Sequence, residues 1–185
     1  MSQLTKKAII QSFVGLLNQM PLDKITVKDI VDDCGVNRGT FYYYFQDIYA
    51  LLEEVFDSET QKVADAAAEY PDWTDGFLQA LSFVRENKRA VYHVFHSIDR
   101  ALLEKHLCRV VGEVMQAAVR TRAEGVPVTE EDICLISDAY TYTLVGVLLA
   151  WLQDGMRGEL EDKVRRLSFL MDDAVRVALD RAAGR

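Results

Sequence analysis

The feature that most constrains the fold is the spacing of the apolar residues. Along almost the whole chain they recur every three or four residues, which is the period of an amphipathic helix. No segment sustains the two-residue alternation of a half-buried strand, and only three prolines interrupt the chain. The pattern therefore predicts an all-α protein, and 185 residues are enough to bury a core without disulfides or metals.

Breaks in this pattern divide the chain into nine expected helices. Pro71 marks the expected boundary between an N-terminal domain, residues 1–50, and a C-terminal domain, residues 71–185, with the fourth helix connecting them. The expected helices cover about 4–18, 26–34, 37–45, 47–70, 73–86, 88–97, 99–123, 130–153 and 159–182.

The second and third helices carry the pattern of a helix-turn-helix. Thr26, with Asp29 three residues later, is close to a capping box, and Asn37 is a suitable cap for the next helix. Between them, Gly35 suits a turn residue with positive φ. Two short helices joined by a tight, glycine-containing turn form a helix-turn-helix, although plain packing units also use this arrangement.

The third helix carries the strongest functional signal. Phe41 and Phe45 lie four residues apart and are expected to face the core, which leaves Tyr42–Tyr44 facing outward. Three consecutive tyrosines on so short a helix cannot all be buried, and this indicates a partner surface. Their hydroxyls suit phosphate oxygens, and their rings suit sugars and thymine methyl groups, so DNA is the favoured partner and a protein the alternative. The candidate DNA-contacting residues are Thr26, Lys28, Arg38, Gly39, Thr40, Tyr42, Tyr43 and Tyr44.

The distribution of charge permits DNA binding without proposing it. The net charge is −8, but residues 1–50 carry five lysines or arginines and five aspartates, so residues 51–185 hold the whole excess. An acidic C-terminal domain repels DNA, so attraction has to come from a local face. Lys6 and Lys7 belong either to a solvated helix face or to the phosphate contacts.

The helix-turn-helix region resembles the tetracycline-repressor-like (TetR) family. The matching stretch is residues 25–52, ITVKDIVDDCGVNRGTFYYYFQDIYALL, with the preceding helix in its expected place. The resemblance implies an all-helical homodimer with an N-terminal DNA-binding head and a C-terminal body that senses a small molecule. The sequence departs from the family at Ile48, where a lysine usually contacts phosphate, so Tyr49 or free helix amides are expected to serve instead. The stretch RGTFYYYFQDIYALLEEV is similar to the branch of regulators of dihydroxyacetone kinase operons.

The C-terminal domain is expected to bind the effector and to form the dimer. Aromatic side chains interleaved with polar groups, between the helices of residues 73–123 and the helix 130–153, are typical of a small-molecule site. The helices 130–153 and 159–182 carry apolar residues at knobs-into-holes spacing and are expected to pack against their symmetry mates. These stripes are Ile133, Ile136, Tyr140, Leu144, Val147 and Trp151 on the first helix, and Leu160, Val164, Leu167, Met171, Ala174 and Ala178 on the second, where Phe169, Leu170 and Val177 add apolar surface. The expected ligand-contacting residues are Tyr92, His93, His96, Tyr140 and Thr143.

The two histidines three residues apart allow other interpretations. His93 and His96 could share a metal ion, line a cavity or simply pack, but no further ligand recurs at a suitable spacing. No metal and no cofactor are therefore expected.

Other classes of protein are disfavoured. The chain has no Gly-rich phosphate loop, no nucleophile elbow and no His-Asp-Ser set that can be placed, so neither an enzyme nor a catalytic residue is expected. It has no secretory signal core, no apolar run of membrane-spanning length and three widely spaced cysteines, which predicts a cytoplasmic protein without a membrane partner.

Together these patterns predict a sequence-specific transcriptional regulator. The expected form is a ligand-responsive repressor that acts as a homodimer on palindromic double-stranded operator DNA. The alternatives are a helical protein-interaction module that uses the tyrosine patch, and an activator of a nearby metabolic operon.

Overall fold

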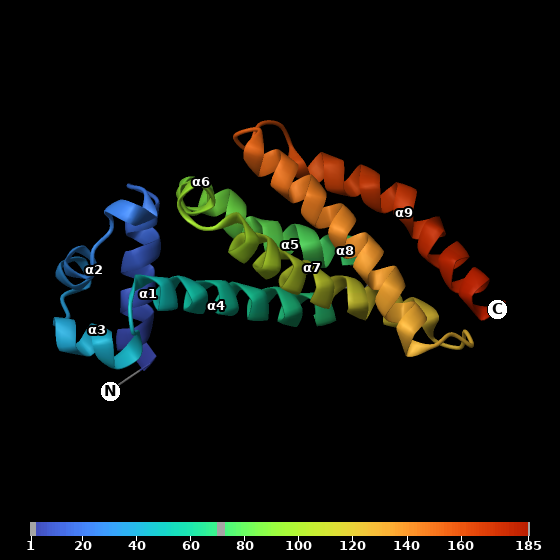
Figure 1. The fold of residues 1–185 in the computed structure, drawn as a ribbon, viewed down its shortest axis with the longest axis horizontal. Helices are drawn as coiled ribbons and strands as arrows, with labels where there is room; N and C mark the ends of the chain where they lie inside the picture. The colour runs from blue at the N-terminus through green and yellow to red at the C-terminus, as the bar shows by residue number, and fades with distance from the viewer. Residues whose placement is uncertain (1–2, 70–72, 185) are drawn as a thin grey trace. The chain divides into compact units, whose positions relative to one another are not determined.

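The computed structural model describes residues 3–69 and 73–184, and every regular element in this part of the chain is a helix (Figure 1). The predicted all-α fold is therefore confirmed, and each helix boundary falls within one or two residues of the expected one. A short 3-10 helix, η1 (Leu22–Lys24), was not expected, because three residues are too few to show a period. The α-helices are α1 (Gln3–Leu17), α2 (Val27–Cys34), α3 (Arg38–Tyr44), α4 (Ile48–Glu69), α5 (Trp73–Glu86), α6 (Lys88–Ser97), α7 (Arg100–Ala123), α8 (Glu130–Gln153) and α9 (Leu160–Ala183).

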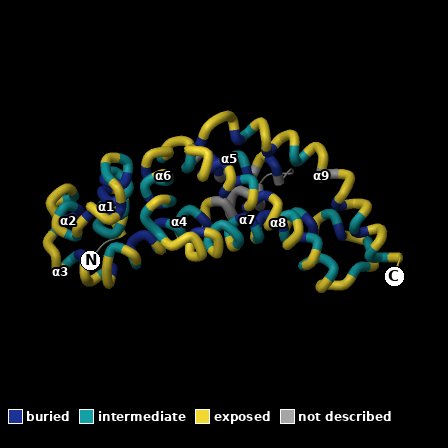
Figure 2. Tube along the Cα trace, turned by 45° about the horizontal axis from the view of Figure 1, so that its top comes forward, coloured by how far each residue is buried: buried dark blue, intermediate teal, exposed yellow. Residues whose placement is uncertain are grey.

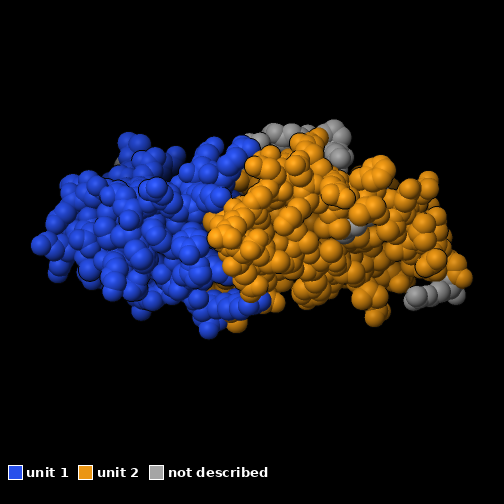
Figure 3. Space-filling view, turned by 90° about the horizontal axis from the view of Figure 1, so that it is seen from above, with its two compact units in different colours: residues 1–60, 83–100 blue, residues 61–82, 101–185 orange. Residues whose placement is uncertain are grey.

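The chain forms two compact units, coloured separately in Figure 3. The head unit comprises residues 1–60 and 83–100, and the body unit comprises residues 61–82 and 101–185. The chain therefore passes from one unit to the other three times. The sequence pattern predicted a domain boundary near residue 70, with residues 83–100 in the C-terminal domain. In the structure, α6 instead packs against α1 and η1 of the N-terminal region. The functional boundary itself stays a prediction.

The head unit is built around one apolar core. Exposed and buried stretches alternate along its helices, as expected for amphipathic helices (Figure 2). A buried hydroxyl adds one polar contact, because Ser12 Oγ donates to the Ile30 carbonyl oxygen at 3.2 Å. The buried apolar side chains are those of Ile9, Phe13, Leu16, Leu17, Leu22, Ile25, Ile30, Val31, Phe41, Phe45, Leu51, Leu52, Val55, Ala90 and Val94.

The body unit buries α8 more than its neighbours. Eight residues of α8 between Ser137 and Leu152 are buried, and α8 packs against α9. Among the described residues, α8 alone is long and apolar enough to span a membrane by length and composition, with a mean hydropathy of 1.7, a test that core helices of soluble proteins also meet. A second core cluster, of Val119, Ala123, Val175 and Leu179, joins α7 to α9.

Candidate nucleic-acid interface

A capping box and a glycine turn fix the two ends of α2. The backbone N–H of Thr26 donates to Asp29 Oδ2 at 2.9 Å, and Thr26 Oγ1 accepts from the Asp29 backbone N–H at 3.3 Å, which is the predicted capping box. These bonds, the Thr26 hydroxyl first, hold the pKa of Asp29 below its ordinary value. Gly35 adopts the left-handed backbone, with φ of 69°, that the predicted turn requires.

The capping box limits what Thr26 can offer to DNA. Its hydroxyl donates to Asp29 Oδ2 at 2.6 Å, so the single O–H proton is already used within the helix start. A phosphate oxygen only accepts hydrogen bonds in the ionised form, and Thr26 therefore has no donor for it while the box is intact. The contact predicted for Thr26 stays a prediction, but its structural role in starting α2 is evident.

The recognition helix α3 begins at Asn37, as predicted. Asn37 Oδ1 accepts from the Thr40 backbone N–H at 2.8 Å and from the Thr40 hydroxyl at 3.2 Å. A Cβ atom on Gly39 would lie 3.2 Å from the same Oδ1 atom, which is tighter than ordinary contact. Gly39 was expected to contact DNA, which stays a prediction, and the structure adds a local reason for glycine here, because it leaves room for the cap.

Removal of this cap is expected to weaken the head. We expect Asn37→Ala to lower the free energy of unfolding by about 1 kcal/mol, since an N-terminal amide loses its acceptor. Urea denaturation of the full-length protein measures the change. Asn37→Asp retains a carboxylate acceptor and is expected to lie close to the wild type; equal losses in both variants would contradict the capping role.

The side chains of α3 divide into an inner and an outer face. The Phe41 ring is fully buried, while Tyr42 and Tyr43 are 57% and 66% exposed, and Arg38 is also exposed. The Tyr42 ring meets the Phe41 ring edge-on at a centroid distance of 5.4 Å. The outward rings are therefore presented by a helix whose inner face is anchored in the core.

Tyr44 differs from its two neighbours. It is half-buried and packs against the head core, and its ring meets that of Tyr43 edge-on at a centroid distance of 5.0 Å. Tyr44 was predicted to face outward with the other two, but a side chain three residues after Phe41 lies close to the inner face. It supports the Tyr43 ring, and its contact with DNA stays a prediction.

The charged residues around α3 take different roles. Lys28, in the first turn of α2, and Lys7 are exposed, whereas Lys6 Nζ pairs with Glu54 Oε1 at 2.7 Å and lies 5.8 Å from the centre of the Phe45 ring. Lys6 thus ties α1 to α4.

The departure at the start of α4 has a structural basis. Ile48 is half-buried against the head core, so an apolar side chain replaces the expected lysine at a position that packs inward. The next residue, Tyr49, was expected to replace the missing phosphate contact. It is 58% exposed, and the contact itself stays a prediction. Asp47 Oδ1 accepts from the Ala50 backbone N–H at 2.8 Å and begins the helix, as predicted.

The five expected ligand-contacting residues are divided between the two units. Tyr92, His93 and His96 belong to the head unit, where His93 Nδ1 bonds to the Leu17 carbonyl oxygen at 2.7 Å. In the body unit, Tyr140 packs against the α7–α9 core cluster, and this burial raises its pKa. Thr143 is exposed, and its hydroxyl donates to the Ala139 carbonyl oxygen at 2.8 Å. Aromatic and polar interleaving reports helix faces and not which faces meet, so the ligand contacts of these residues stay a prediction.

The body unit contains a hollow elsewhere than expected. Its volume is about 660 Å³, and its described lining comes from α5, α7 and α9, whereas the sequence placed the pocket against the helix 130–153. The hydroxyls of Thr74 and Ser168 bond to each other across it. No group of three or more potential metal ligands occurs among the described residues. The described lining residues are Thr74, Arg122, Arg165, Ser168, Phe169, Leu170 and Asp173.

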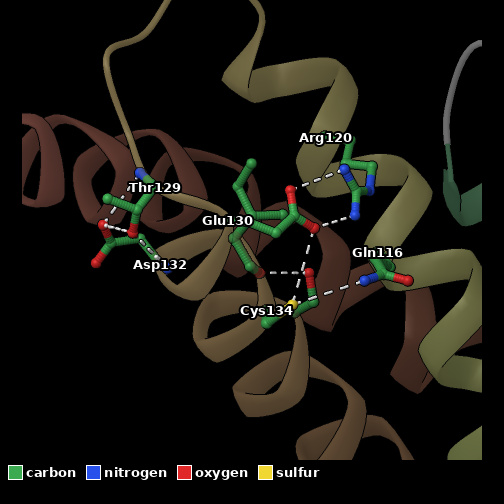
Figure 4. A network of polar contacts seen from close by, with 8 residues as sticks. Gln116, Arg120, Thr129, Glu130, Asp132 and Cys134 are labelled. Carbon is green, nitrogen blue, oxygen red and sulfur yellow. Dashed lines mark hydrogen bonds and ion pairs between the residues drawn. The ribbon is translucent and has the colours of Figure 1, made fainter.

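A polar network joins α7 to α8 (Figure 4). Arg120 contacts both carboxylate oxygens of Glu130, with Nη1 3.0 Å from Oε2, and Gln116 Nε2 lies 3.8 Å from Cys134 Sγ. Thr129 and Asp132 form a second capping box at the start of α8. The polar groups of these side chains bond to one another and connect the end of α7 to the start of α8, so the network has a structural role that requires no ligand.

An outward-facing, capped recognition helix on a compact head defines a DNA-binding protein of the helix-turn-helix class. Comparison with known proteins agrees with this class. The family model "Bacterial regulatory proteins, tetR family" matches residues 9–55, and the model "Transcriptional regulator C-terminal region" matches residues 71–173, more than half of the chain. The chain belongs to the TetR family of bacterial transcription regulators, as the sequence indicated. Members of this family are regulators and not enzymes.

Individual relatives share the family at lower identity. The "HTH-type dhaKLM operon transcriptional activator DhaS" of Lactococcus lactis subsp. lactis (strain IL1403) is 29% identical over 94 residues, which cover 51% of this chain and 50% of DhaS. The "HTH-type transcriptional regulator AcrR" of Shigella flexneri is 29% identical over 128 residues, which cover 64% of this chain and 57% of AcrR. The matches thus span about half the length of these curated relatives.

Solved structures share the fold. The "Dihydroxyacetone kinase operon activator DhaS" superposes with a TM-score of 0.80 at 18% identity, over 95% of this chain and 98% of that one. A TetR regulator from Streptococcus agalactiae 2603V superposes with a TM-score of 0.60 at 21% identity, over 91% and 93%. The resemblance expected to regulators of dihydroxyacetone kinase operons is therefore found in both sequence and fold.

Proposed function

We propose that this protein is a cytoplasmic, ligand-responsive transcriptional regulator that binds a palindromic operator as a homodimer. One observation carries the proposal: Arg38, Tyr42 and Tyr43 project from a helix that is anchored by Phe41 and capped by Asn37. A recognition helix of this kind inserts into the major groove, where arginine reaches guanine edges and an aromatic ring packs on a thymine methyl group.

The proposed roles are divided among the exposed and half-buried side chains of α3 and the start of α2. Arg38 and Tyr43 are assigned to the base edges, and Lys28, Thr40 and Tyr42 to phosphates. The Thr40 hydroxyl can turn from Asn37 to a phosphate, because Asn37 Oδ1 keeps the stronger bond from the Thr40 backbone N–H. The head is not strongly basic, so affinity depends on these local contacts more than on overall charge.

The proposed roles of two neighbouring tyrosines can be separated. We expect Tyr43→Ala to weaken preferred sites by about 1–3 kcal/mol and to flatten the preference at one base position, because a base contact is lost. Tyr42→Phe removes only a hydroxyl and is expected to weaken all sequences alike. Both side chains are exposed, so folding is preserved, and selection from a randomised DNA pool measures both profiles. A Tyr43→Ala profile identical to that of the wild type would refute the assignment.

The proposed dimer interface lies on the outward faces of α8 and α9. On α8, Leu135, Ala139, Tyr142, Gly146 and Ala150 are exposed at steps of four, three, four and four residues, which places them on one face. On α9, Phe169, Leu170 and Val177 are exposed, Phe169 by 84%, and the first two also border the hollow described above. So much exposed apolar surface on two packed helices favours a second copy, which forms a four-helix interface.

This interface differs from the stripe that was expected to form it. Leu160 and Val164 on α9, like Leu144 and Trp151 on α8, are buried within the chain itself. Knobs-into-holes spacing reports any close helix contact, and here α8 and α9 satisfy it against their own chain. The prediction that these four residues form the seam between subunits was wrong, whereas Phe169, Leu170 and Val177, which belonged to the same prediction, are exposed.

Repression is the proposed direction of control, and activation is the alternative. The Lactococcus lactis relative DhaS is named as an activator, which supports that alternative. A reporter fused to the promoter beside a bound genomic site decides between them. Higher expression in a strain that lacks the regulator supports repression, and lower expression supports activation.

A mobility-shift assay on genomic fragments tests the function itself. Retention of a few fragments by the full-length protein, in the presence of excess non-specific DNA, is the expected result. Binding of all fragments alike, or of none, would instead favour a protein-interaction module that uses the exposed tyrosines.

A further inference from the structure

Side chains from regions that two different family models match hold α6 to the end of α1. The family model for the N-terminal region ends at residue 55, and residues 83–100 fall within the model for the C-terminal region. In the structure these residues belong to the head unit. The contact between α1 and α6 is formed by side chains at the last turn of one helix and the first turns of the other.

One amide side chain caps both helices. Asn18 Nδ2 donates to the Val14 carbonyl oxygen at 3.0 Å, which satisfies a free carbonyl at the end of α1. Asn18 Oδ1 accepts from the Ala90 backbone N–H at 3.2 Å, in the first turn of α6. The residue at the cap position of α6, Asn87, makes no side-chain capping bond to its own helix. The free amide of α6 is therefore capped by a residue 72 positions away in the sequence.

Two further bonds complete the contact. Asn18 Nδ2 also donates to Asn87 Oδ1 at 3.0 Å, and Asn87 Nδ2 donates to the Phe83 carbonyl oxygen at 3.1 Å, at the end of α5. The Nδ1–H of His93 donates to the carbonyl oxygen of Leu17, the last residue of α1, at 2.7 Å. Buried Ala90 and Val94 place the same face of α6 on the head core.

We propose that Asn18, Asn87 and His93 form a clamp that makes α6 part of the head, and that Asn18 is thereby a positioning residue for operator binding. This role rests on the proposed function. The chain passes between the units at residues 60–61, 82–83 and 100–101. With α6 clamped, the head is tied to the body by all three passages. Without the clamp, α1–α3 are tied to the body only through α4.

The number of ties determines how freely the head can reorient. A dimeric helix-turn-helix protein has to hold its two recognition helices about 34–36 Å apart to reach successive major grooves. A head with one tie samples many orientations and loses entropy when it binds, whereas a head with three ties is preorganised. The clamp therefore favours one spacing between the two operator half-sites.

Amide hydrogen exchange on the full-length protein tests the clamp without DNA. We expect Asn18→Ala to speed exchange at the Ala90 amide roughly 5- to 30-fold, the factor that corresponds to 1–2 kcal/mol. Gln19→Ala is the matched control, because Gln19 Nε2 donates to the Gly15 carbonyl oxygen at 3.2 Å, a bond at the same helix end that stays within α1 and its cap. Equal exchange at Ala90 in the two variants would overturn the clamp.

Operators of altered spacing test the positioning role. The probes are the preferred genomic site and versions with one base pair inserted or removed between the half-sites. The wild type and Gln19→Ala are expected to discriminate strongly, and Asn18→Ala to bind the preferred site less well while the altered sites lose little. A uniform loss on all three DNAs would show that Asn18 only stabilises the head and would refute the positioning role.

A second variant protects this test from misfolding. Asn18→Asp has the same shape but places an acceptor opposite Asn87 Oδ1, so it is expected to weaken the discrimination between operator spacings, as Asn18→Ala does. Discrimination unchanged from the wild type in this variant would count against the clamp. If the wild type bound no operator at all, the proposed function would fail, and the exchange measurement would still decide on the clamp.

Discussion

Phe41→Ala is expected to abolish operator binding by unfolding the head. The Phe41 ring is fully buried in the head core, and its removal leaves a cavity between α3 and the helices that it packs against. Truncation of a buried phenylalanine typically costs about 3–5 kcal/mol, which is a large part of the stability of a domain. Urea denaturation followed by circular dichroism measures the loss, and a mobility shift on the same samples measures binding.

The neighbouring position supplies the control for this prediction. Tyr42→Ala removes a ring that is 57% exposed, and surface changes of this kind usually alter stability by less than about 0.5 kcal/mol. Tyr42→Ala is therefore expected to remain folded even though it binds DNA less well. Comparable unfolding curves for the two variants would mean that the inner and outer faces of α3 are assigned wrongly.

A single charge on α8 is expected to separate the dimer. Tyr142 is 64% exposed in the centre of the outward α8 stripe, and Tyr142→Glu would bury an unpaired carboxylate in the proposed interface. A single head then binds one half-site, and operator affinity is expected to fall roughly 10²- to 10⁴-fold, the advantage that linked binding sites provide. Sedimentation at micromolar concentration measures the subunit state.

The matching control introduces the same charge outside the stripe. Leu102 on α7 is 38% exposed, and Leu102→Glu is expected to leave both the dimer and the operator affinity unchanged. A monomeric wild type would contradict the dimer, and a dimeric Tyr142→Glu variant would place its interface on a different face.

Local signals in the sequence predicted the head well. Thr26, Asn37 and Asp47 each cap the helix that they were expected to begin, because a cap depends only on residues within one turn. Phe41 was correctly placed inside, because four-residue spacing from Phe45 defines one helix face. The period of the apolar residues also located the long helices, whose faces are wide enough to average over exceptions.

Contacts between distant segments could not be predicted in the same way. His93 was expected to contact a ligand, which stays a prediction, and the structure adds a bond from its Nδ1 to the Leu17 carbonyl oxygen. An imidazole at a helix face suits a cavity and a free carbonyl equally well, so its sequence position alone could not reveal this bond. The contact of Asn18 with Ala90 could not be predicted, because an asparagine after a helix is common and Ala90 lies 72 residues away in the sequence. The stripe at Leu160 and Val164 was correctly read as a contact surface, but spacing alone does not distinguish the same chain from a second copy.

Photo-crosslinking from position 43 tests most directly whether the outer face of α3 reads DNA. Benzoylphenylalanine in place of Tyr43, in the full-length protein on its selected genomic site, is expected to crosslink to bases in both half-sites, about one helical turn apart. The same residue in place of Tyr92, a tyrosine of α6 that is 43% exposed, supplies the control and is expected to give no crosslink to DNA. Crosslinks from position 92 and none from position 43 would contradict the account.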